Sequence, residues 1–330
     1  MKNDHLNNDV AQVSSEGSGG PPAPSPSAPG PKAAEGETPN KLAAEPTERR
    51  ATIQLLTEVV DCSPCGGPNH LLKIRAGAEF WGDLSLAAGR FVRLRAWPRR
   101  RSDPDFPDLG PASPFPLLDR PFSVHQVVDG EVRFLIRKVG PGTKLLTALA
   151  AGSKILLTGP LGVPLLDKRP DFKSHSWYLA AGGAGLGPMP AVMNLLKPEK
   201  SFLFYGERSG SFQVDESYLQ KMTGGRFLAT TEDGSGHGQK GLVTEPLAAA
   251  LEREPRAIFG CGPPGLLKAL AETAKSFQVD YVACVEARMA CGLGVCLSCS
   301  LPMKDGSNFR VCREGPSVDG LSLAWDEIRG

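Results

Sequence analysis

The spacing of hydrophobic residues changes once along the chain, and this change constrains the fold more than any other feature. Between residues 54 and 160, short runs with a period near two are separated by turns, as in QLLTEVV and VRFLIRKV. Between residues 175 and 285, strand-like runs alternate with helical ones, as in SFLFYGE followed by FQVDESYLQKM. The first pattern predicts an antiparallel barrel or sandwich, and the second predicts a parallel sheet with right-handed crossovers.

The β-rich part predicts six strands and one helical interruption at 143–150. Asp129-Gly130 favours a hairpin, because both residues tolerate the positive φ of a type I′ turn. The expected strands are 54–60, 70–76, 90–97, 121–128, 132–139 and 154–159.

Composition divides the chain into four parts. Residues 1–50 contain no Phe, Trp or Tyr and are rich in Pro, Gly and Ser, which predicts a disordered tail. We expect a β-barrel over 51–165, an α/β domain over 170–283 and a small cysteine-rich subdomain over 284–330.

Charge and hydropathy exclude several functional classes. The chain of 330 residues has 37 Lys and Arg against 36 Asp and Glu, so its net charge of +1 gives no general case for binding nucleic acid or an anionic membrane. No stretch approaches the roughly 18 apolar residues of a spanning helix, and the N-terminus does not resemble a secretory signal. We therefore expect a soluble, cytoplasmic protein.

Four of the 8 cysteines fall within residues 291 to 312 with the spacing C-x4-C-x2-C, followed by a fourth cysteine. This is the plant-type ferredoxin spacing for a [2Fe-2S] cluster. Gly292 and Gly294 would let the loop approach an inorganic sulfide. A structural zinc site also accepts four thiolates, but such sites more often pair two C-x2-C knuckles. The candidate metal ligands are Cys291, Cys296, Cys299 and Cys312, with the first two expected on one iron and the last two on the other.

The other cysteines favour structural roles. Cys284 lies in an apolar run and is expected to be a buried strand thiol. Cys62 and Cys65 form a lone C-x2-C in a Pro/Gly turn, where a redox or metal role is the less favoured alternative.

A glycine-rich turn, Ala181 to Pro188, follows the apolar run SWYLA and precedes a helical run. Backbone amides and the positive end of a helix at such a turn suit a pyrophosphate. Beyond the next strand, Glu207 suits ribose hydroxyls and Arg208 suits a 2′-phosphate, so the two residues distinguish NADH from NADPH only weakly.

Three further turns are compatible with cofactor binding. Taken alone, the turn at 260–265 favours a structural role, and the other two are equally compatible with a structural and a functional role. Residues 260–265, GCGPPG, would let a planar ring lie against the backbone. Arg120 at a strand start suits a phosphate, and Ser123 suits a flavin ring edge. Gly142 and Thr143 offer amides and a hydroxyl at a helix N-terminus.

Taken in order, these motifs resemble the ferredoxin-reductase-like flavoproteins over residues 52 to 325. Within that family, the segment from Glu286 to Cys296 and the closing RVCREGP at 310–316 resemble the electron-transfer subunit of NAD-dependent dihydroorotate dehydrogenase. The tail at 1–50 and the insert at 99–119 depart from the family pattern. The resemblance implies a β + α/β fold: an antiparallel six-stranded FAD-binding barrel, a parallel-sheet NAD-binding domain and a small [2Fe-2S] subdomain.

The resemblance also implies FAD, a [2Fe-2S] cluster and NAD(H) as cofactors, with no catalytic side chain. An intermediary that exchanges both hydride and single electrons must stand between nicotinamide and cluster, and flavin has that property. The implied function is electron transfer between NAD and a partner, an FMN-containing dihydroorotate dehydrogenase of pyrimidine biosynthesis, in a heterotetramer. The expected cofactor-binding residues are Arg120, Pro121, Phe122, Ser123, Leu135, Ile136, Arg137, Gly142, Thr143, Gly182, Gly183, Gly185, Gly187, Cys261, Gly262 and Pro263.

Two alternatives remain open from the sequence. One is a subunit of an NAD(P)H:ferredoxin oxidoreductase, a sulfide dehydrogenase or a sulfhydrogenase, for which the basic run Arg99 to Arg101 is either a docking site for an acidic carrier or a solvated loop. The other is a zinc-stabilised interaction module without catalytic activity. No Ser-His-Asp or H-E-x-x-H pattern competes with redox chemistry, and His125 is expected to be a hydrogen-bonded barrel histidine.

Overall fold

The computed structural model describes residues 52–81, 87–97 and 118–328. The expected N-terminal tail, the run Arg99 to Arg101 and most of the expected insert at 99–119 lie outside these residues and stay predictions. Within the described ranges, no helix is both long and apolar enough to cross a bilayer.

Antiparallel strands form the first sheet, in the order β4-β3-β7-β1-β2-β6-β5. Side chains alternate between its faces. Val92, Leu94 and Ala96 of β3 enter a buried core, whereas Arg93 and Arg95 lie on the opposite face. The strands are β1 (Ile53–Pro64), β2 (Asn69–Arg75), β3 (Phe91–Ala96), β4 (Arg120–Ser123), β5 (Gln126–Val128), β6 (Glu131–Arg137) and β7 (Lys154–Leu161).

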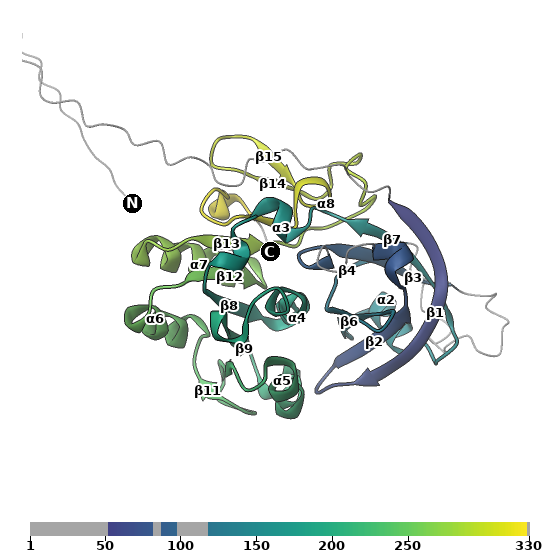
Figure 1. Cartoon of the computed structure of the whole chain (residues 1–330), viewed down its shortest axis with the longest axis horizontal. Helices are drawn as coiled ribbons and strands as arrows, with labels where there is room; N and C mark the ends of the chain where they lie inside the picture. Colours follow the sequence, from purple (N-terminus) through teal and green to yellow (C-terminus); the bar gives the residue numbers. More distant parts are fainter. Residues whose placement is uncertain (1–51, 82–86, 98–117, 329–330) are drawn as a thin grey trace, which may run out of the picture. The chain divides into compact units, whose positions relative to one another are not determined.

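The predicted barrel is confirmed, but the strand expected at 121–128 is two strands. Val124 and His125 separate them, because the Val124 amide donates to the Arg90 carbonyl and the His125 amide donates to the Arg133 carbonyl, each at 3.0 Å. β4 and β5 are therefore the two edges of the sheet although they are consecutive in the chain. The sheet must curl until these edges meet, which gives the barrel seen among β1 to β7 in Figure 1.

The turn between β5 and β6 confirms the predicted hairpin. Asp129 has φ 53° and Gly130 has φ 76°, the left-handed conformation that a type I′ turn requires. Short helices α1 (Ala78–Trp81) and α2 (Pro141–Thr147) accompany the barrel strands.

The second sheet has the order β11-β10-β9-β8-β12-β13-β16, and its strands are parallel except β16. Strand and helix alternate along this part of the chain, as the sequence predicts. Its strands are β8 (Trp177–Gly182), β9 (Ser201–Glu207), β10 (Phe227–Thr231), β11 (Gln239–Lys240), β12 (Ala257–Cys261), β13 (Tyr281–Cys284) and β16 (Ser317–Asp319). The helices are α3 (Leu165–Lys168), α4 (Met189–Met193), α5 (Glu216–Thr223), α6 (Thr244–Arg253) and α7 (Pro264–Phe277).

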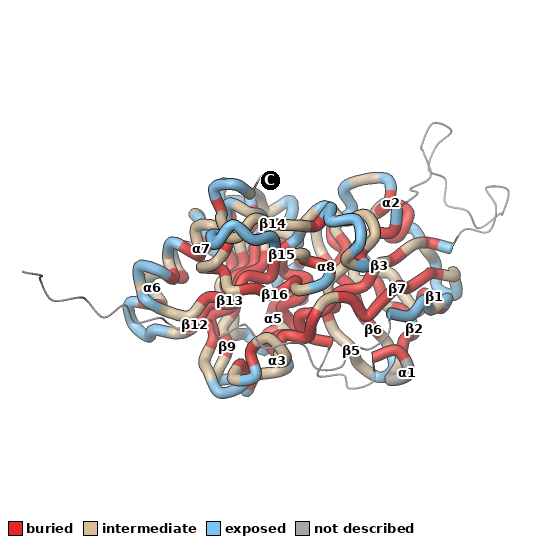
Figure 2. Tube along the Cα trace, turned by 90° about the horizontal axis from the view of Figure 1, so that it is seen from above, coloured by how far each residue is buried: buried red, intermediate tan, exposed pale blue. Residues whose placement is uncertain are grey.

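Helices cover both faces of this sheet. Trp177, Leu179 and Ala181 of β8 pack in the cluster that holds α4 and α5, whereas Tyr178 and Ala180 pack in the cluster that holds α6 and α7. Figure 2 shows β12, β13 and β16 of the second sheet buried and much of α6 exposed. Because parallel strands covered on both faces align their carboxyl ends along one edge, this arrangement leaves that edge available for ligands.

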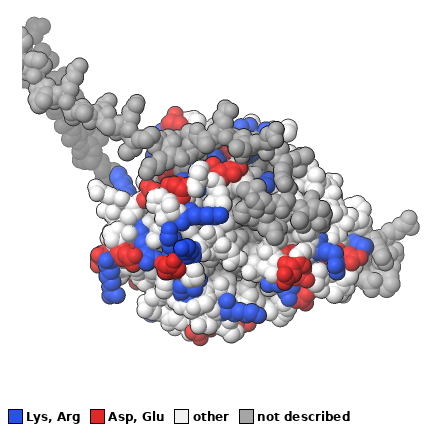
Figure 3. Space-filling view, viewed as in Figure 1, with Lys and Arg blue, Asp and Glu red and all other residues white. Residues whose placement is uncertain are grey.

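Surface charge follows no single sign. On the face drawn in Figure 3, acidic and basic side chains are interspersed, in keeping with the net charge of +1. This face therefore offers no extended field of the kind that attracts nucleic acid.

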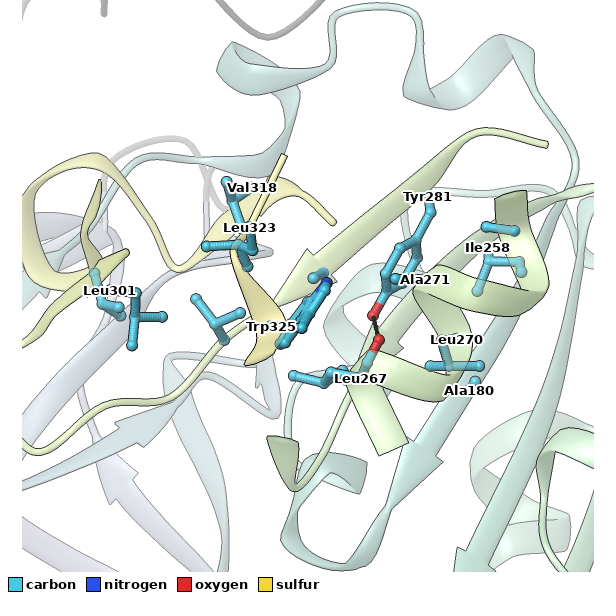
Figure 4. Close-up of a cluster of buried hydrophobic side chains, with 14 of the residues drawn as sticks. Ala180, Ile258, Leu267, Leu270, Ala271, Tyr281, Leu301, Val318, Leu323 and Trp325 are labelled. Atoms are coloured by element: carbon cyan, nitrogen blue, oxygen red, sulfur yellow. Dashed lines mark hydrogen bonds between the residues drawn. The ribbon is translucent and has the colours of Figure 1, made fainter. Parts of the chain in front are cut away.

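The last part of the chain shares a core with the second sheet. Figure 4 shows Trp325 beside Leu267 and Tyr281, and Leu301 and Leu323 belong to the same buried cluster. Burying a large apolar side chain contributes about 1.5–3 kcal/mol, so these contacts hold the segment on the sheet. The segment contains β14 (Ser300–Pro302), β15 (Asn308–Arg310) and α8 (Val311–Glu314) before β16. The expected domain limits stay predictions.

Candidate functional site

A cavity of about 630 Å³ lies along the carboxyl ends of β8, β9 and β12. Gly182, Gly183, Gly185, Gly262 and Pro263, all expected to bind a nucleotide, line this cavity. Cys261 is fully buried behind it, and Gly187 is absent from its lining. The last part of the chain, which sequence reasoning did not assign to this site, adds Val285, Glu286, Leu301, Trp325 and Ile328.

Close backbone packing explains the glycines of the turn after β8. Gly183 has φ 58°, a conformation that disfavours larger residues. A Cβ at Gly185 would overlap the Cys261 carbonyl, and one at Gly182 would lie 2.6 Å from Leu266 Cδ2. The turns after β8 and β12 thus approach each other so closely that their amides border one cavity.

Glu207 lines the cavity, but its carboxylate already has partners. Arg137, from β6 of the barrel, donates to both of its oxygens, and Tyr205 donates to Oε1 at 2.8 Å. The Glu207 side chain is only 4% exposed. Burial is the main cause that raises the pKa of Tyr205, and the neighbouring Glu207 carboxylate raises it further. Glu207 Oε2 has one of these hydrogen bonds and can accept another, so the expected bond from Glu207 to ribose hydroxyls stays a prediction, and Arg208 lines the same cavity.

Arg137 joins the two sheets. Besides Glu207, its guanidinium donates to Asn69 Oδ1 at 3.0 Å and to the Phe212 carbonyl at 3.3 Å, and it borders the cavity beside Gly183. The sequence indicates Arg137 only as a cofactor ligand, because its partner Glu207 lies 70 residues away.

On the barrel, the two motifs expected to bind flavin phosphates lie together. A Cβ at Gly142 would be 2.8 Å from Arg120 Nε, so the Arg120 guanidinium covers the first turn of α2. The Thr143 hydroxyl accepts from the amides of Val139 and Gly140 at 2.9 and 3.0 Å, so it caps the helix start. The positive charge of Arg120 at the N-terminal end of a helix suits an anion.

The remaining flavin candidates lie along β4 and β6. Among the described residues, the Ser123 hydroxyl has no hydrogen-bond partner, and Phe122 is half-buried against the barrel core beside exposed Pro121. β5 pairs with only Glu131–Arg133 of β6. Residues 134–137 thus have no strand partner on that side within the described part of the chain. The side chain of Ile136 is fully buried, so Leu135 and Ile136 fit a cofactor only through this open backbone edge.

The cysteine loop follows β13, and its thiols are associated in two pairs. The amides of Leu293 and Cys296 donate to Cys291 Sγ at 3.3 and 3.4 Å, and the amide of Cys312 donates to Cys299 Sγ at 3.5 Å. These are the pairs expected to share an iron. Cys296 is exposed, whereas Cys299 and Cys312 are buried.

The backbone of this loop takes the expected shape. Gly292 and Gly294 have φ 68° and 83°, and Leu297 has φ 58°. A bond from Ser298 is the main cause that lowers the pKa of Cys296 to about 6, whereas burial raises the pKa of Cys312 to about 12. No group of three or more His, Cys, Asp and Glu side chains in the described ranges is arranged around a single ion. Four thiols, associated in two pairs by hydrogen bonds from backbone amides, fit the donor set of a binuclear cluster.

The other sulfurs and His125 have structural surroundings. Cys284 is buried in β13, as predicted. Burial raises the pKa of Cys62 to about 11 and that of Cys65 to about 12, which disfavours reactive thiolates. His125 is bonded through Nδ1 to the Gly187 carbonyl at 2.7 Å and through Nε2 to the Tyr218 hydroxyl. It is hydrogen-bonded as predicted, but its partners lie outside the barrel, in the turn after β8 and in α5.

Comparison with known proteins agrees with these sites. Residues 286–324 match the iron-sulfur cluster binding domain of dihydroorotate dehydrogenase B. The electron transfer subunit of dihydroorotate dehydrogenase B (NAD(+)) from Clostridium acetobutylicum is 32% identical over 248 residues, which cover 74% of this chain and 89% of the relative. The subunit of the same name from Clostridium perfringens is 34% identical over 219 residues, 64% of this chain and 84% of the relative.

Solved structures share the fold. The NADH-dependent reduced ferredoxin-NADP oxidoreductase superposes with a TM-score of 0.64 at 22% identity, covering 83% of this chain and 91% of the other. The ferredoxin reductase of carbazole 1,9a-dioxygenase gives 0.52 at 20% identity, covering 70% and 67%.

The cofactor set expected from the sequence is FAD, a [2Fe-2S] cluster and NAD(H). It is supported by the iron-sulfur domain match, by NAD-dependent relatives and by the reductase fold. Because the C. acetobutylicum relative is matched over most of its length, the chain belongs to the family of electron transfer subunits of NAD-dependent dihydroorotate dehydrogenase B.

Proposed function

We propose that this chain transfers electrons between NAD(H) and a separate dihydroorotate-oxidising subunit through FAD and a [2Fe-2S] cluster. The observation that carries the proposal is the cysteine loop with its C-x4-C-x2-C spacing. In it, backbone amides donate hydrogen bonds that associate the thiols in two pairs. The loop belongs to a reductase fold with a nucleotide cavity. When bound, the flavin exchanges hydride with nicotinamide and single electrons with the cluster. The side chains described here bind and orient these groups.

For the nucleotide, the turn after β8 supplies the main contacts. The backbone from Gly182 to Gly185 lines the cavity where a pyrophosphate would meet the carboxyl edge of a parallel sheet. Gly262 and Pro263, with Cys261 behind them, form a flat wall at the end of β12 against which a nicotinamide ring fits. Arg208 directly follows β9, and within the described residues it is the cation in the cavity lining whose side chain has no hydrogen bond or ion pair. This supports acceptance of a phosphate on the ribose more than the sequence alone does.

For the flavin, Arg120 and the first turn of α2 hold the phosphates. Gly142 keeps the helix start open under the Arg120 guanidinium, because a side chain there would displace it. The free hydroxyl of Ser123 and the open edge of β6 at Leu135 to Arg137 then suit the polar rim of the ring. These residues orient the cofactor and perform no proton transfer.

For the cluster, Cys291 and Cys296 would hold one iron, and Cys299 and Cys312 the other. The amides that donate to Cys291 and Cys299 sulfurs stabilise thiolate charge, and hydrogen bonds of this kind raise cluster reduction potentials. Exposed Leu293, Val295 and Leu297 surround exposed Cys296, so an apolar partner face can reach the cluster at this edge.

The partner in this proposal is an FMN-binding dihydroorotate dehydrogenase chain in a heterotetramer, located in the cytoplasm. All 8 cysteines are free thiols, which suits a reducing compartment.

Coexpression with an FMN-binding dihydroorotate dehydrogenase tests the proposal. A complex loaded with flavins and cluster is expected to reduce NAD with dihydroorotate, and each chain alone is not. A fully loaded complex that cannot do so would remove this assignment. Reduction of a ferredoxin by the same chain alone with NADH would support the oxidoreductase alternative instead.

A further inference from the structure

Arg93, on β3 of the barrel, forms a hydrogen bond to the cysteine loop. Its Nη1 donates to the Cys291 carbonyl, across 198 residues of sequence. A Cβ at Gly292 would lie 2.6 Å from Arg93 Cδ, so the loop rests on the aliphatic part of this side chain. Although Arg93 lies on the outer face of its strand, the loop covers it until only 13% of the side chain is exposed.

A buried carboxylate fixes the other end of the guanidinium. Arg93 Nη2 lies 3.3 Å from Asp119 Oδ2, and Asp119 is only 8% exposed. Arg95 Nε lies 3.3 Å from the other oxygen of the same carboxylate. Two arginines facing one aspartate leave a net positive charge next to the loop.

Asp119 also connects this network to the flavin motif. The next residue is Arg120, which covers the first turn of α2, and Arg93 pairs with Pro121 in the β3 and β4 ladder. One continuous set of contacts therefore runs from the Cys291 carbonyl through Arg93 and Asp119 to the start of the flavin motif. No other described barrel side chain donates to the segment from Cys291 to Cys299.

The same side of the barrel meets the chain after α8. The Val163 amide, just beyond β7, donates to the Gly315 carbonyl at 2.7 Å, and Lys168 lies over the Phe309 ring at 6.0 Å. The body of this region is thus already attached to the barrel near β7 (Figure 1). What Arg93 adds is a contact at the cysteine loop itself.

We propose that Arg93 is a positioning residue that fixes the Cys291 to Cys296 loop against the flavin barrel and raises the reduction potential of the cluster. This inference rests on the proposed function for the cluster. A cation held beside iron-bound thiolates stabilises the reduced cluster, which carries one more negative charge than the oxidised one. The positioning part concerns the protein alone and holds without iron.

Arg95 offers a matched control. It lies two residues away on the same face of β3 and faces the same Asp119, but it has no contact with the cysteine loop in the described structure. Arg93→Gln and Arg95→Gln therefore remove the same charge next to the same carboxylate. They differ in whether the Cys291 carbonyl loses its donor.

The first measurement is amide hydrogen exchange over residues 290–296 in metal-free protein. Arg93→Gln is expected to accelerate exchange there by about tenfold, because a hydrogen bond from a charged donor is lost. Arg95→Gln is expected to leave these amides unchanged. Equal exchange in both variants would overturn the positioning role.

The second measurement is an EPR-monitored redox titration of the loaded protein. Arg93→Gln is expected to lower the cluster midpoint potential by more than Arg95→Gln does, and Arg93→Lys, which retains the charge, is expected to stay nearer the native potential. Equal potentials in all three would overturn the electrostatic part. If the native protein binds no cluster, the proposed function fails, and the exchange result still decides the positioning role.

Should Arg93→Gln fail to fold, Arg93→Lys decides the positioning part. It is expected to accelerate loop exchange, because an ammonium cannot serve both the Cys291 carbonyl and Asp119 in the geometry of a guanidinium. Native exchange in Arg93→Lys would contradict the need for this guanidinium. The electrostatic part is then decided by Arg93→Met, which removes the charge and is expected to have a lower midpoint potential than Arg93→Lys; equal potentials would overturn it.

Discussion

The nucleotide turn after β8 and the cysteine loop after β13 are both glycine-containing turns at the ends of parallel strands, but protein atoms hold them very differently. Gly183 and Gly185 are enclosed by the β12 turn and by Arg137, where a side chain has no room. The cysteine loop instead exposes Leu293, Val295 and Leu297. It is held by Arg93 and by hydrogen bonds from its own backbone amides to its cysteine sulfurs.

This difference has a physical consequence. The nucleotide turn is packed against the turn after β12, so contacts within the protein hold its shape. The cysteine loop has few protein contacts, so the binding free energy of its inorganic group must supply much of its order. Substitutions in the first region should alter folding, whereas those in the second should alter the cluster with little effect on the fold.

The largest expected effect is on the cluster. Cys296→Ser should abolish the [2Fe-2S] EPR signal and electron transfer to the partner, because one of four thiolates is lost. Cys296 is exposed, so the unfolding temperature of the metal-free protein should stay within about 1 °C of native.

Cys62→Ser is the matched control, since Cys62 lies in the barrel away from the loop. It should retain the signal. A retained signal in Cys296→Ser would remove this residue from the ligand set.

The Arg137 and Glu207 pair should show the largest effect on stability. Arg137→Met leaves Glu207 buried without its cation and should lower the free energy of unfolding by about 3 kcal/mol. The double variant Arg137→Met, Glu207→Leu should lose less than the sum of the two single changes in urea unfolding. Additive losses would mean that the two side chains do not interact.

Close packing of the nucleotide turn predicts a smaller loss. Gly185→Ala should lower the unfolding free energy by about 1–3 kcal/mol and raise the KM for NADH, because the added methyl overlaps the Cys261 carbonyl. Gly265→Ala, at the same cavity, meets no atom within 4 Å and should leave the unfolding free energy nearly unchanged. Equal behaviour of the two variants would show that the turn is not tightly enclosed.

One further effect is absent at neutral pH and appears only on acidification. Burial lowers the pKa of His125 to about 4. The hydrogen bond to the Gly187 carbonyl raises this pKa in part, and the positive charge of Arg133 lowers it further. The unfolded chain, with a His pKa near 6.5, binds the proton first, so this contribution is complete above about pH 6.5 and is lost as pH falls toward 4.

At pH 5 the native protein should therefore have lost about 2 kcal/mol of unfolding free energy through this histidine. Urea unfolding at pH 7.5 and pH 5 measures the loss, and His125→Gln should reduce the difference. An unchanged pH dependence in that variant would mean that His125 is protonated in the folded protein.

Local patterns predicted what local physics controls. Period-two runs identified the barrel strands, the strand and helix alternation identified the second sheet, and the cysteine spacing identified the segment that matches an iron-sulfur domain. Asp129-Gly130 identified its turn, because the required φ depends on those two residues alone.

Long-range pairings could not be read from the sequence. Arg93 meets Cys291, Arg137 meets Glu207 and His125 meets Gly187 over 198, 70 and 62 residues, respectively. Nothing in the local sequence of either partner specifies the other. The division of the strand at 121–128 is similar, because Val124 and His125 change partners only when the barrel closes.

The proposed function requires that the four cysteines hold an iron-sulfur cluster. Anaerobically purified protein should be measured for iron, sulfide and zinc, with a low-temperature EPR spectrum after dithionite. We expect a coloured protein with one [2Fe-2S] cluster per chain and the EPR signal of its reduced form. A colourless protein that contains zinc and gives no signal after reconstitution with iron and sulfide would contradict the proposed function.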